Sequence, residues 1–493
     1  MAQRVKSVSS YFASSQPSCI AAVPTDSEHL IIGTYSLEKI PGCDFSDDDS
    51  DDENEEACRQ EEGDAGERRQ NRFGELLMWR SDGVQQLMYF NCGILDIAFS
   101  PHDPDRMYAA TSTGRILYLR VRRNKRSMIA MEGFDMFMVV EIQVFKTNIL
   151  ILDLEFHPIH KNIVGITTST GSISLLNIQG LDDPAIDSTI PMYRPTTPAF
   201  TITIAELYRT TLEAWTLTFA PNGSALYFGS DDSTLGTAPL QPASRLFFTP
   251  AAPDPHPDIV GPHRLSQRRF AKQNPVLTAQ TTSLLSAPAS VISRTHTAGV
   301  TSILPLHAQG PNSILLTGSY DDRIRVVRPS RKPVARTLAE RDLGGGVWRL
   351  KMIEQEGGGV DERRWLVLVA CMFAGAKVVE VRCKDWRQAV EGQGEGDGGF
   401  EIAVVAEFTE HESMCYGAEV VKSEQEKKVE GRGREVVSTS FYDKMVAAWE
   451  FGGREGSSDV EEEVDEVEEG DEDEEGDVEE EGDKDEDEGV DKP

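Results

Sequence analysis

The sequence predicts an all-β protein in which seven similar sheets close into a ring, a β-propeller. A phrase made of a strand, a tight turn containing Asp or Gly, and a second strand recurs seven times along the 493 residues. Another apolar strand lies upstream of each copy. Repeated sheets with a period of roughly 40 residues or more are typical of propeller blades.

The clearest copy of the phrase is TGSYDDRIRVV at 317–327. Gly318 and Ser319 let the backbone close up, and an Asp in the turn 320–322 accepts hydrogen bonds from the backbone N–H groups that follow it. Weaker copies lie at 33–35, 113–118, 170–175, 229–232, 374–379 and 440–446. The last of these ends on Trp449-Glu450, close to the Trp-Asp pair of WD40 repeats. We expect the phrase to form the third and fourth strands of a WD40-type blade.

The upstream strands supply the rest of each blade. Three of them carry an aromatic residue two positions before a proline, as Phe99 and Pro101 do in ILDIAFSP. The seven predicted first strands are 18–23, 94–101, 150–158, 215–221, 300–305, 347–352 and 416–421. An open β-sandwich is the alternative, but it would make the regular turns a coincidence.

The propeller is predicted at residues 17–451, after an N-terminal segment (1–16) that is a candidate for the strand closing the ring. We expect an insert (44–70) to interrupt blade one between its third and fourth strands. The fourth strands of blades one and two are predicted at 75–80 and 116–121. Blades three to seven are expected at 149–178, 201–240, 296–328, 343–382 and 403–451. Segment 180–200 is predicted to be a loop between blades, and a Pro/Ser/Thr-rich insertion (241–294) is expected to be poorly ordered.

The net charge of −34 belongs to two segments. Residues 44–67 contain thirteen acidic residues and one arginine, and residues 455–493 contain twenty-four acidic residues and two lysines. Such composition predicts disorder, so we expect an acidic disordered insert (44–70) and an acidic disordered C-terminal tail (452–493). These segments either keep the protein soluble or dock a basic partner, and they carry no information about a substrate.

Seven cysteines without a CxxC pair predict reduced thiols, an intracellular protein and no zinc site. Residues 1–13 contain no apolar run, so no signal peptide is expected. No stretch reaches the about 18 apolar residues that a membrane span needs. We therefore expect a cytoplasmic protein.

Motifs of common enzymes are missing from the sequence. It contains no G-x-S-x-G, P-loop, H-E-x-x-H or strand-associated G-x-G-x-x-G motif. The glycine run 344–346 precedes a predicted strand and indicates a close backbone approach near the ring axis. A methyltransferase is disfavoured, because no cofactor-binding βαβ unit is predicted. Motifs alone would suggest a binding platform.

Unusual residues gather at the predicted starts of the first strands, which meet around one end of the central channel of a propeller. We expect this mouth to be lined by Trp215, Trp348, Tyr416, His296, His411, Asp96 and Asp153. A histidine at this point of a WD40 blade commonly bonds the turn Asp of its own blade. A structural role therefore stays open for both histidines, as it does for the turn residues Asp321 and Asp443.

Several phrases together resemble one family, the diphthine methyl ester hydrolases, which are the WD40-repeat proteins of diphthamide biosynthesis. The phrases are His296-x-x-Gly299-Val300, LLTGSYDDRIRV (315–326), LGGGVWRLK (343–351), HESMCYGAE (411–419) and STSFYDKMVAAW (438–449). The match is close over blades five to seven and looser over blades two to four. The sequence departs from the family pattern at Val420, where Trp would be expected.

The resemblance implies a carboxylic ester hydrolase that demethylates diphthine methyl ester on translation elongation factor 2. Its substrate would be a protein side chain that carries a quaternary ammonium and a methyl ester. No metal or other cofactor is expected. The implied partner is the elongation factor alone, without nucleic acid or membrane, and we expect a monomer.

Roles for the mouth residues follow as hypotheses. Aromatic faces attract a quaternary ammonium through cation–π contact. We assign substrate binding to Trp348, Tyr416, Trp215, Arg349, His296 and Tyr320, with Arg349 or the N–H groups of 344–346 as donors to an oxyanion. His411 is predicted to activate water as general base, oriented by Asp443 or Glu412. Ser413 is an alternative nucleophile, but nothing around it indicates activation.

A propeller scaffold without catalytic activity is the competing interpretation, for example an adaptor in ubiquitin ligation or membrane traffic. It accounts for the fold and the acidic segments equally well. It gives no reason for an aromatic, histidine-bearing mouth, and a scaffold should tolerate polar replacements there.

Overall fold

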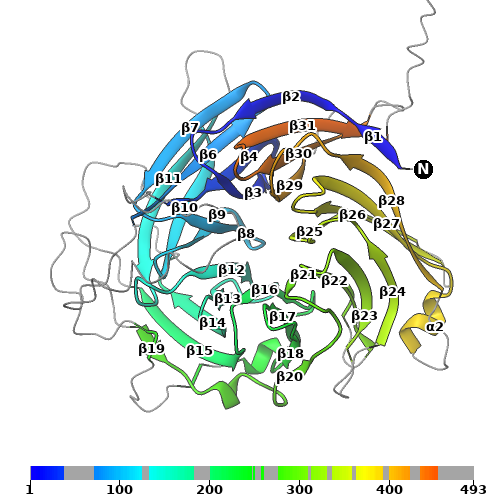
Figure 1. The fold of residues 1–493 in the computed structure, drawn as a ribbon. Helices are drawn as coiled ribbons and strands as arrows, with labels where there is room; N and C mark the ends of the chain where they lie inside the picture. The colour runs from blue at the N-terminus through cyan, green and yellow to red at the C-terminus, as the bar shows by residue number, and fades with distance from the viewer. Residues whose placement is uncertain are drawn as a thin grey trace, which may run out of the picture. The chain divides into compact units, whose positions relative to one another are not determined.

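Seven sheets form a closed ring in the computed structural model (Figure 1). The structure describes residues 2–37, 71–124, 133–181, 200–246, 248–249, 257–259, 276–308, 312–329, 336–357, 362–391, 399–421 and 433–452. All of these belong to one compact unit, Met1–Gly453. The predicted all-β propeller with seven blades is confirmed, whereas the acidic insert (44–70) and the acidic tail beyond residue 452 lie outside the described residues.

The first three blades follow one another along the chain. Blade one contains β3 (Pro17–Val23), β4 (Asp26–Thr34), β6 (Arg72–Arg80) and β7 (Gly83–Phe90), with the short β5 (Ser36–Leu37) paired to β6. Blade two contains β8 (Ile94–Ser100), β9 (Asp103–Thr111), β10 (Arg115–Asn124) and β11 (Gly133–Gln143). Blade three contains β12 (Ile151–Phe156), β13 (Ile163–Thr168), β14 (Ser172–Gln179), β15 (Thr201–Arg209) and, at its edge, β19 (Val276–Thr278).

The other four blades complete the ring. Blade four contains β16 (Ala214–Phe219), β17 (Ala225–Ser230), β18 (Leu235–Pro239) and β20 (Ser290–Ile292). Blade five contains β21 (Val300–His307), β22 (Ile314–Ser319), β23 (Arg323–Arg328) and β24 (Arg336–Asp342). Blade six contains β25 (Arg349–Glu356), β26 (Arg363–Ala370), β27 (Ala376–Cys383), β28 (Phe400–Phe408) and β1 (Gln3–Val5). Blade seven contains β29 (Cys415–Val421), β30 (Arg434–Ser440), β31 (Met445–Phe451) and β2 (Ser7–Phe12).

Helical segments are short. They are η1 (Ala243–Arg245), η2 (Thr281–Ser283) and α2 (Trp386–Glu391) among the residues that the structure describes. In this part of the chain, no helix combines the length and the apolar character needed to cross a bilayer.

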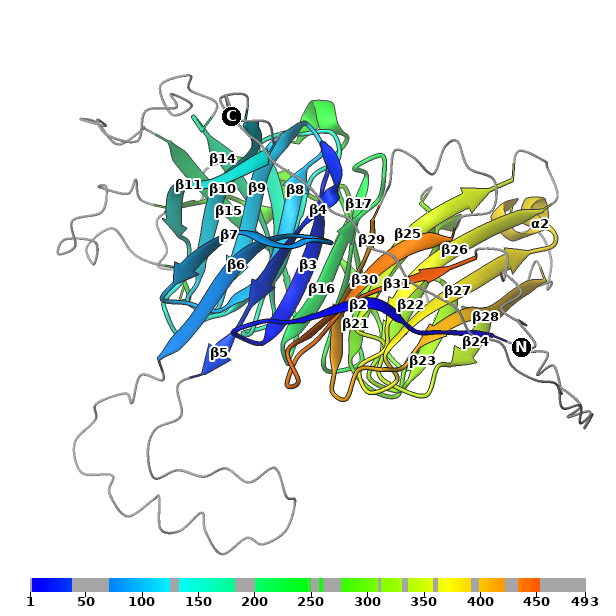
Figure 2. The same cartoon turned by 90° about the horizontal axis from the view of Figure 1, so that it is seen from above.

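The N-terminal segment closes the ring. Strand β2 pairs antiparallel with β31, in a register that places Tyr11 opposite Val446, and β1 pairs in parallel with β28 of blade six. Figures 1 and 2 show β1 and β2 running along the outside of blades six and seven. Blade seven is thus built from both ends of the described chain, because backbone hydrogen bonds join β2, near the start of the sequence, to the last strand β31.

The seven predicted first strands are the innermost strands β3, β8, β12, β16, β21, β25 and β29 (Figure 1). The recurring phrase, however, forms the second and third strands of its blade, not the third and fourth. The segments 75–80 and 116–121 are therefore parts of the third strands β6 and β10, and residues 38–70 separate the second and third strands of blade one. In blade five, for example, the fourth strand β24 forms the outer edge and has the mixed sequence RTLAERD, with no strong apolar pattern.

Two further blade boundaries differ from the predicted ones, because the fourth strands were not recognised in the sequence. Segment 180–200 lies within blade three, because β15 is the fourth strand of that blade. The insertion 241–294 contributes β19 to blade three and β20 to blade four, so the expectation of poor order was wrong for its described residues. Likewise, blades five and six extend to β24 and β28.

One backbone requirement explains why the turn recurs. Between the second and third strands, Ser233, Asp322 and Lys444 have φ of 61°, 63° and 60°. At the equivalent point of three other blades, Gly114, Gly171 and Gly375 have φ of 67°, 79° and 71°. Glycine adopts this left-handed conformation without cost and Asp tolerates it, whereas Ser233 and Lys444 adopt it at a steric cost.

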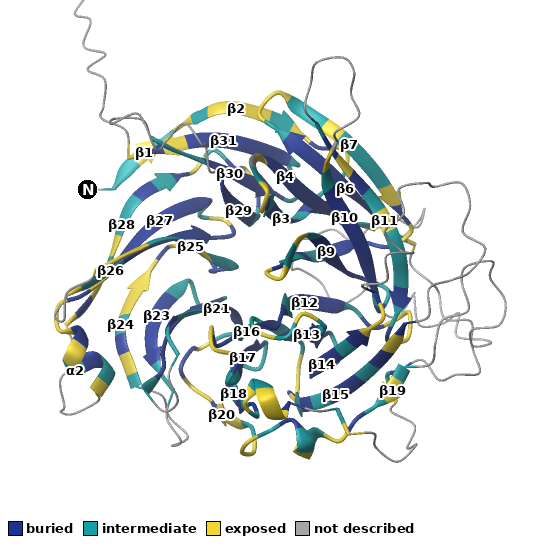
Figure 3. Ribbon diagram, turned by 180° about the vertical axis from the view of Figure 1, so that it is seen from behind, coloured by how far each residue is buried: buried dark blue, intermediate teal, exposed yellow. Residues whose placement is uncertain are grey.

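The apolar core lies between neighbouring blades. Leu316 and Val326 of blade five pack with Trp365 and Val367 of blade six in one buried cluster. Figure 3 shows the inner and middle strands largely buried, with exposed residues along outer strands such as β2. This two-sided burial is the physical reason why inner strands read as continuous apolar runs in the sequence.

Side chains of one blade hold the free inner edge of the next. Asp96 accepts a hydrogen bond from the N–H of Leu154 at 3.1 Å, and Asp153 accepts one from Leu217 at 2.9 Å. Elsewhere in the ring, Ser302 accepts from Leu350 at 3.0 Å and Glu419 from Ala22 at 3.3 Å. These bonds occupy backbone groups that a propeller would otherwise leave unpaired along its channel.

Candidate active site

One face of the ring collects the residues that the sequence singled out. Because strands alternate in direction, the starts of the first strands and the turns after the second strands lie on the same face. Trp215 and Tyr416 are the second residues of β16 and β29, Trp348 directly precedes β25, and Tyr320 begins the turn after β22. The fold therefore delivers four aromatic side chains from four blades to one place.

These four residues form a contiguous group, here called the aromatic cluster. Trp348 lies at its middle, with ring-centroid distances of 5.5 Å to Trp215, 5.9 Å to Tyr320 and 4.9 Å to Tyr416. Trp215 and Tyr320 are 6.1 Å apart. None of the rings stack flat on one another, since the interplanar angles are 45° or more. Tilted rings leave parts of several π faces available to a cation.

The cluster extends to two residues that sequence reasoning missed. Phe441 lies 5.3 Å from Tyr416, and Tyr442 lies 5.0 Å from Phe441 and is 61% exposed. Both belong to the turn of blade seven, where Tyr442 holds the phrase position of Tyr320 and Phe441 directly precedes it. That equivalence was the signal that could have identified them.

The residues of the aromatic cluster differ in whether a hydrogen bond fixes their side chain. The indole N–H of Trp215 donates to Asp231 at 2.9 Å, and the hydroxyl of Tyr416 donates to Met414 Sδ at 2.8 Å. The indole nitrogen of Trp348 is buried and has no hydrogen-bond partner among the described residues. Burial raises the pKa of Tyr416 to about 12 and raises that of Tyr320 as well, so both hydroxyls stay protonated at neutral pH.

Arg349 connects the aromatic cluster to two carboxyl groups. Its guanidinium carbon lies 5.4 Å from the centre of the Trp348 ring, and Nη2 lies 3.8 Å from Asp96 Oδ1. Burial lowers the pKa of Arg349, but the charges of Asp153 and Asp96 outweigh it and raise this pKa. The arginine is therefore a fixed cation between the indole and the carboxyl pair.

The two carboxyl groups come from neighbouring inner strands. Asp96 is the third residue of β8 and Asp153 the third of β12, and each accepts a backbone N–H of the next blade through its Oδ2. Burial, followed by the charge of Asp153, raises the pKa of Asp96 well above its usual range. Below them on β12, burial raises the pKa of Glu155 to about 8. Both aspartates had been predicted at the mouth, but their place beside Arg349 had not.

His411, predicted as the general base, has a structural environment. Its Nε2 is 2.7 Å from Ser438 Oγ, which also accepts the indole N–H of Trp449 at 3.0 Å. The Nδ1 atom of His411 is buried and has no hydrogen-bond partner among the described residues. The contact with Ser438 favours the structural alternative for His411, and its role as general base stays a prediction.

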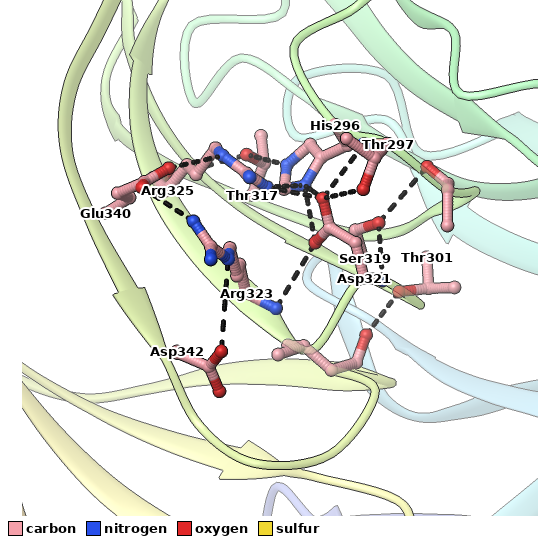
Figure 4. Close-up of polar contacts among 12 residues, drawn as sticks. His296, Thr297, Thr301, Thr317, Ser319, Asp321, Arg323, Arg325, Glu340 and Asp342 are labelled. Atoms are coloured by element: carbon pink, nitrogen blue, oxygen red, sulfur yellow. Dashed lines mark hydrogen bonds and ion pairs between the residues drawn. The ribbon is translucent and has the colours of Figure 1, made fainter.

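His296 occupies the corresponding network of blade five rather than the aromatic cluster (Figure 4). Nε2 is 2.8 Å from Thr317 Oγ1, and Nδ1 is 3.2 Å from Asp321 Oδ1 and also contacts Arg325. Burial lowers the pKa of His296, against the opposing effect of Asp321. These contacts favour the structural role that the sequence left open for His296, since both ring nitrogens bond within the blade.

The predicted partners of His411 also serve the turn of blade seven. Asp443 accepts the backbone N–H of Glu412 at 3.0 Å, and the side chain of Glu412 is exposed. Ser413 Oγ accepts the N–H groups of Met414 at 2.6 Å and Tyr442 at 3.0 Å. These bonds fix a loop and provide no activated nucleophile. In the described part of the chain, no group of three or more His, Cys, Asp or Glu is placed to hold a metal ion.

The fold and these networks define a seven-bladed propeller of the WD40 type, with an aromatic and acidic site at one mouth. Two curated relatives support the resemblance stated above. The chain is 24% identical over 392 residues to the diphthine methyltransferase of Saccharomyces cerevisiae, a match that covers 72% of this chain and 82% of the relative. It is 25% identical over 383 residues to the protein of the same name from Schizosaccharomyces pombe, covering 77% and 86%. The resemblance to this group of proteins is thereby confirmed.

Other comparisons are less specific. No family model matches the chain. Solved structures with a similar arrangement include Sqt1 from Chaetomium thermophilum bound to the N-terminus of the ribosomal protein L10, with 15% identity and a TM-score of 0.48, covering 91% of this chain and all of that one. A chain of the mitotic checkpoint complex gives 9% identity and a TM-score of 0.42. The assignment of the fold rests on the sheets described above.

Proposed function

We propose that this protein is a carboxylic ester hydrolase that removes the methyl ester from diphthine methyl ester on translation elongation factor 2. The printed name of the two yeast relatives, diphthine methyltransferase, supports a role in diphthamide biosynthesis. The observation that carries the proposal further is the aromatic cluster with Arg349 beside it. A side chain that bears both a quaternary ammonium and an ester requires two such subsites next to each other.

The aromatic cluster suits the trimethylammonium end of this substrate. Each well-placed aromatic face contributes ~0.5–2 kcal/mol to binding a cation, and Trp is the best of the three ring types. Arg349 by itself would repel the ammonium. Asp96 and Asp153 face Arg349 and compensate its charge, so the site can accept a second cation.

The ester lies, in this proposal, at the Arg349 side of the cluster. A guanidinium aimed at the carbonyl oxygen stabilises the negative charge that develops when water attacks. The oxyanion role suggested by the sequence for Arg349 is therefore kept, together with substrate binding by Trp215, Tyr320, Trp348 and Tyr416. His296, His411, Glu412 and Asp443 are left out, because their contacts hold blades and turns together.

The experiment is incubation of the purified protein with elongation factor 2 that carries the methyl ester, followed by mass spectrometry and a methanol assay. Hydrolysis lowers the mass of the modified residue by one methylene and releases methanol without a methyl donor. The relatives' printed name denotes methyl transfer, which would instead raise the mass and require a donor. A stable complex without any mass change would favour the scaffold interpretation.

We also propose a cytoplasmic monomer, which size-exclusion chromatography with light scattering and localisation of a tagged protein would test.

A further inference from the structure

The carboxyl pair and Arg349 form a polar group that the assigned roles do not fully use. Asp96 and Asp153 each bond a backbone N–H of the next blade with one oxygen, at 3.1 and 2.9 Å. Edge bonding of this kind needs only a neutral acceptor, as Ser302 shows at the same task with a hydroxyl. Asp153 is buried and Asp96 is largely so, two carboxyls exceed that need, and removing them from water costs free energy.

We propose that Asp96 and Asp153 together are the general base and general acid of the ester hydrolysis. The inference rests on the proposed function. Burial and the neighbouring charge of Asp153 favour the protonated form of Asp96, and such a carboxyl beside a second one can supply a proton while the other accepts one. Because the edge bonds use Oδ2 of each residue, an Oδ1 oxygen of each remains for this chemistry.

The location fits the proposed substrate. β8, β12 and β25 lie around the centre of the ring (Figure 1), and Arg349 Nη2 is 3.8 Å from Asp96 Oδ1. The same guanidinium lies over Trp348, whose buried indole nitrogen has no hydrogen-bond partner in the described part of the chain. An ester held beside Arg349, with its ammonium on the aromatic cluster, would meet the carboxyl pair.

The reaction balances with water as the only co-reactant. The ionised carboxyl takes a proton from water while the water oxygen forms a bond to the ester carbon, and the oxyanion that results faces Arg349. The bond from this carbon to the methoxy oxygen then breaks, and a carboxyl of the pair gives its proton to the leaving oxygen. Methanol and a carboxylic acid are produced, and the pair again holds one proton.

The test uses full-length protein and the ester-bearing factor, with the variants Asp96→Asn and Asp153→Asn. An amide oxygen still accepts the edge N–H bond, so folding is preserved while proton transfer is removed. We expect kcat to fall ~10²–10⁴-fold in each variant, with a much smaller change in KM. Glu419→Gln is the matched control, because Glu419 bonds the edge of blade one without belonging to the pair. It should keep the wild-type kcat.

Two further measurements distinguish a catalytic role of the carboxyl pair from a purely structural one. Infrared difference spectroscopy should detect a protonated carboxyl at neutral pH in the wild type and not in Asp96→Asn. The wild-type rate should depend on pH as a bell, since losing or gaining a proton disables the pair. Wild-type kcat in both Asn variants, or a rate that does not change from about pH 4 to 9, would refute the role of the carboxyl pair while the proposed hydrolase function stands. Wild-type protein that releases no methanol would refute both the role of the pair and the proposed hydrolase function.

Discussion

The guanidinium of Arg349 lies over the indole of Trp348, 5.4 Å from the ring centre, and this contact joins the aromatic and the acidic halves of the site. One face of Trp348 is thereby used by a cation of the protein itself. The tilted rings of Trp215 and Tyr416 supply further faces for a cation from outside. The arrangement predicts separate effects of substitutions in the two halves.

Replacing Trp348 with Leu should weaken substrate binding. Loss of one good cation–π face, ~0.5–2 kcal/mol, corresponds to a rise in KM of roughly 2- to 30-fold, with a smaller fall in kcat. Trp386→Leu is the matched control, because Arg363 lies 5.2 Å from that ring in an equivalent contact at the outer side of blade six. Steady-state kinetics on the ester-bearing factor would show an unchanged KM for the control. Equal effects of both variants would contradict the role of Trp348.

The first strands could be predicted from the sequence because they are buried on both sides. ILDIAF in β8 and ILDLEF in β12 read as apolar runs that end before a proline. Some fourth strands are short or mixed in sequence, such as SVI in β20 and RTLAERD in β24, so nothing local distinguishes them from loops. The ring was therefore predictable, and the division of each blade was not.

The aromatic cluster was predictable for a related reason: the repeat fixes where each strand starts, and the starts share one face. Roles within the site depend on contacts between distant residues. His411 meets Ser438, 27 residues away, and Asp96 meets the backbone of Leu154, 58 residues away. A histidine in this phrase looks the same in sequence whether it bonds a serine or faces a substrate.

His411 should determine part of the acid sensitivity of the fold. Burial lowers its pKa to about 4, against the opposing charges of Asp443 and Glu410, while the unfolded chain has a pKa near 6.5. Between these values the unfolded state binds more protons. The contribution of His411 to the free energy of unfolding is therefore fully present above about pH 6.5 and falls by roughly 3 kcal/mol as the pH drops to about 4. In His411→Gln this loss of stability should be smaller, but not absent, because burial also lowers the pKa of His157 to about 4.

Urea unfolding at several pH values would measure this effect. The same variant should keep the wild-type kcat above pH 7, because the imidazole holds blade seven and does not act on substrate. Identical pH slopes for variant and wild type would show that His411 is not protonated selectively in the unfolded state. A large loss of kcat in a folded variant would restore it as a catalytic candidate.

Closure of the ring by β2 predicts unequal effects of two neighbouring substitutions. Tyr11 packs against the buried cluster that contains Val437 and Val446, whereas Val8 on the same strand is 70% exposed. Tyr11→Ala should lower the free energy of unfolding by about 1–3 kcal/mol, and Val8→Ala by less than about 0.5 kcal/mol. Chemical denaturation of both variants checks this. Equal, small effects would mean that the N-terminal strand adds little to the closed ring.

The turn of blade six should be the least tolerant of substitution. Gly375 has a φ of 71°, and a Cβ there would lie 2.2 Å from the carbonyl oxygen of Phe408. Gly375→Ala combines an unfavourable backbone conformation with a clash against backbone that cannot move easily, so we expect a loss of at least ~2 kcal/mol. Gly133→Ala is the control, since a Cβ at that position meets no atom within 4 Å. Thermal unfolding of the two variants should therefore separate clearly, and a Gly375→Ala protein as stable as the control would show that the turn can relax around an added methyl group.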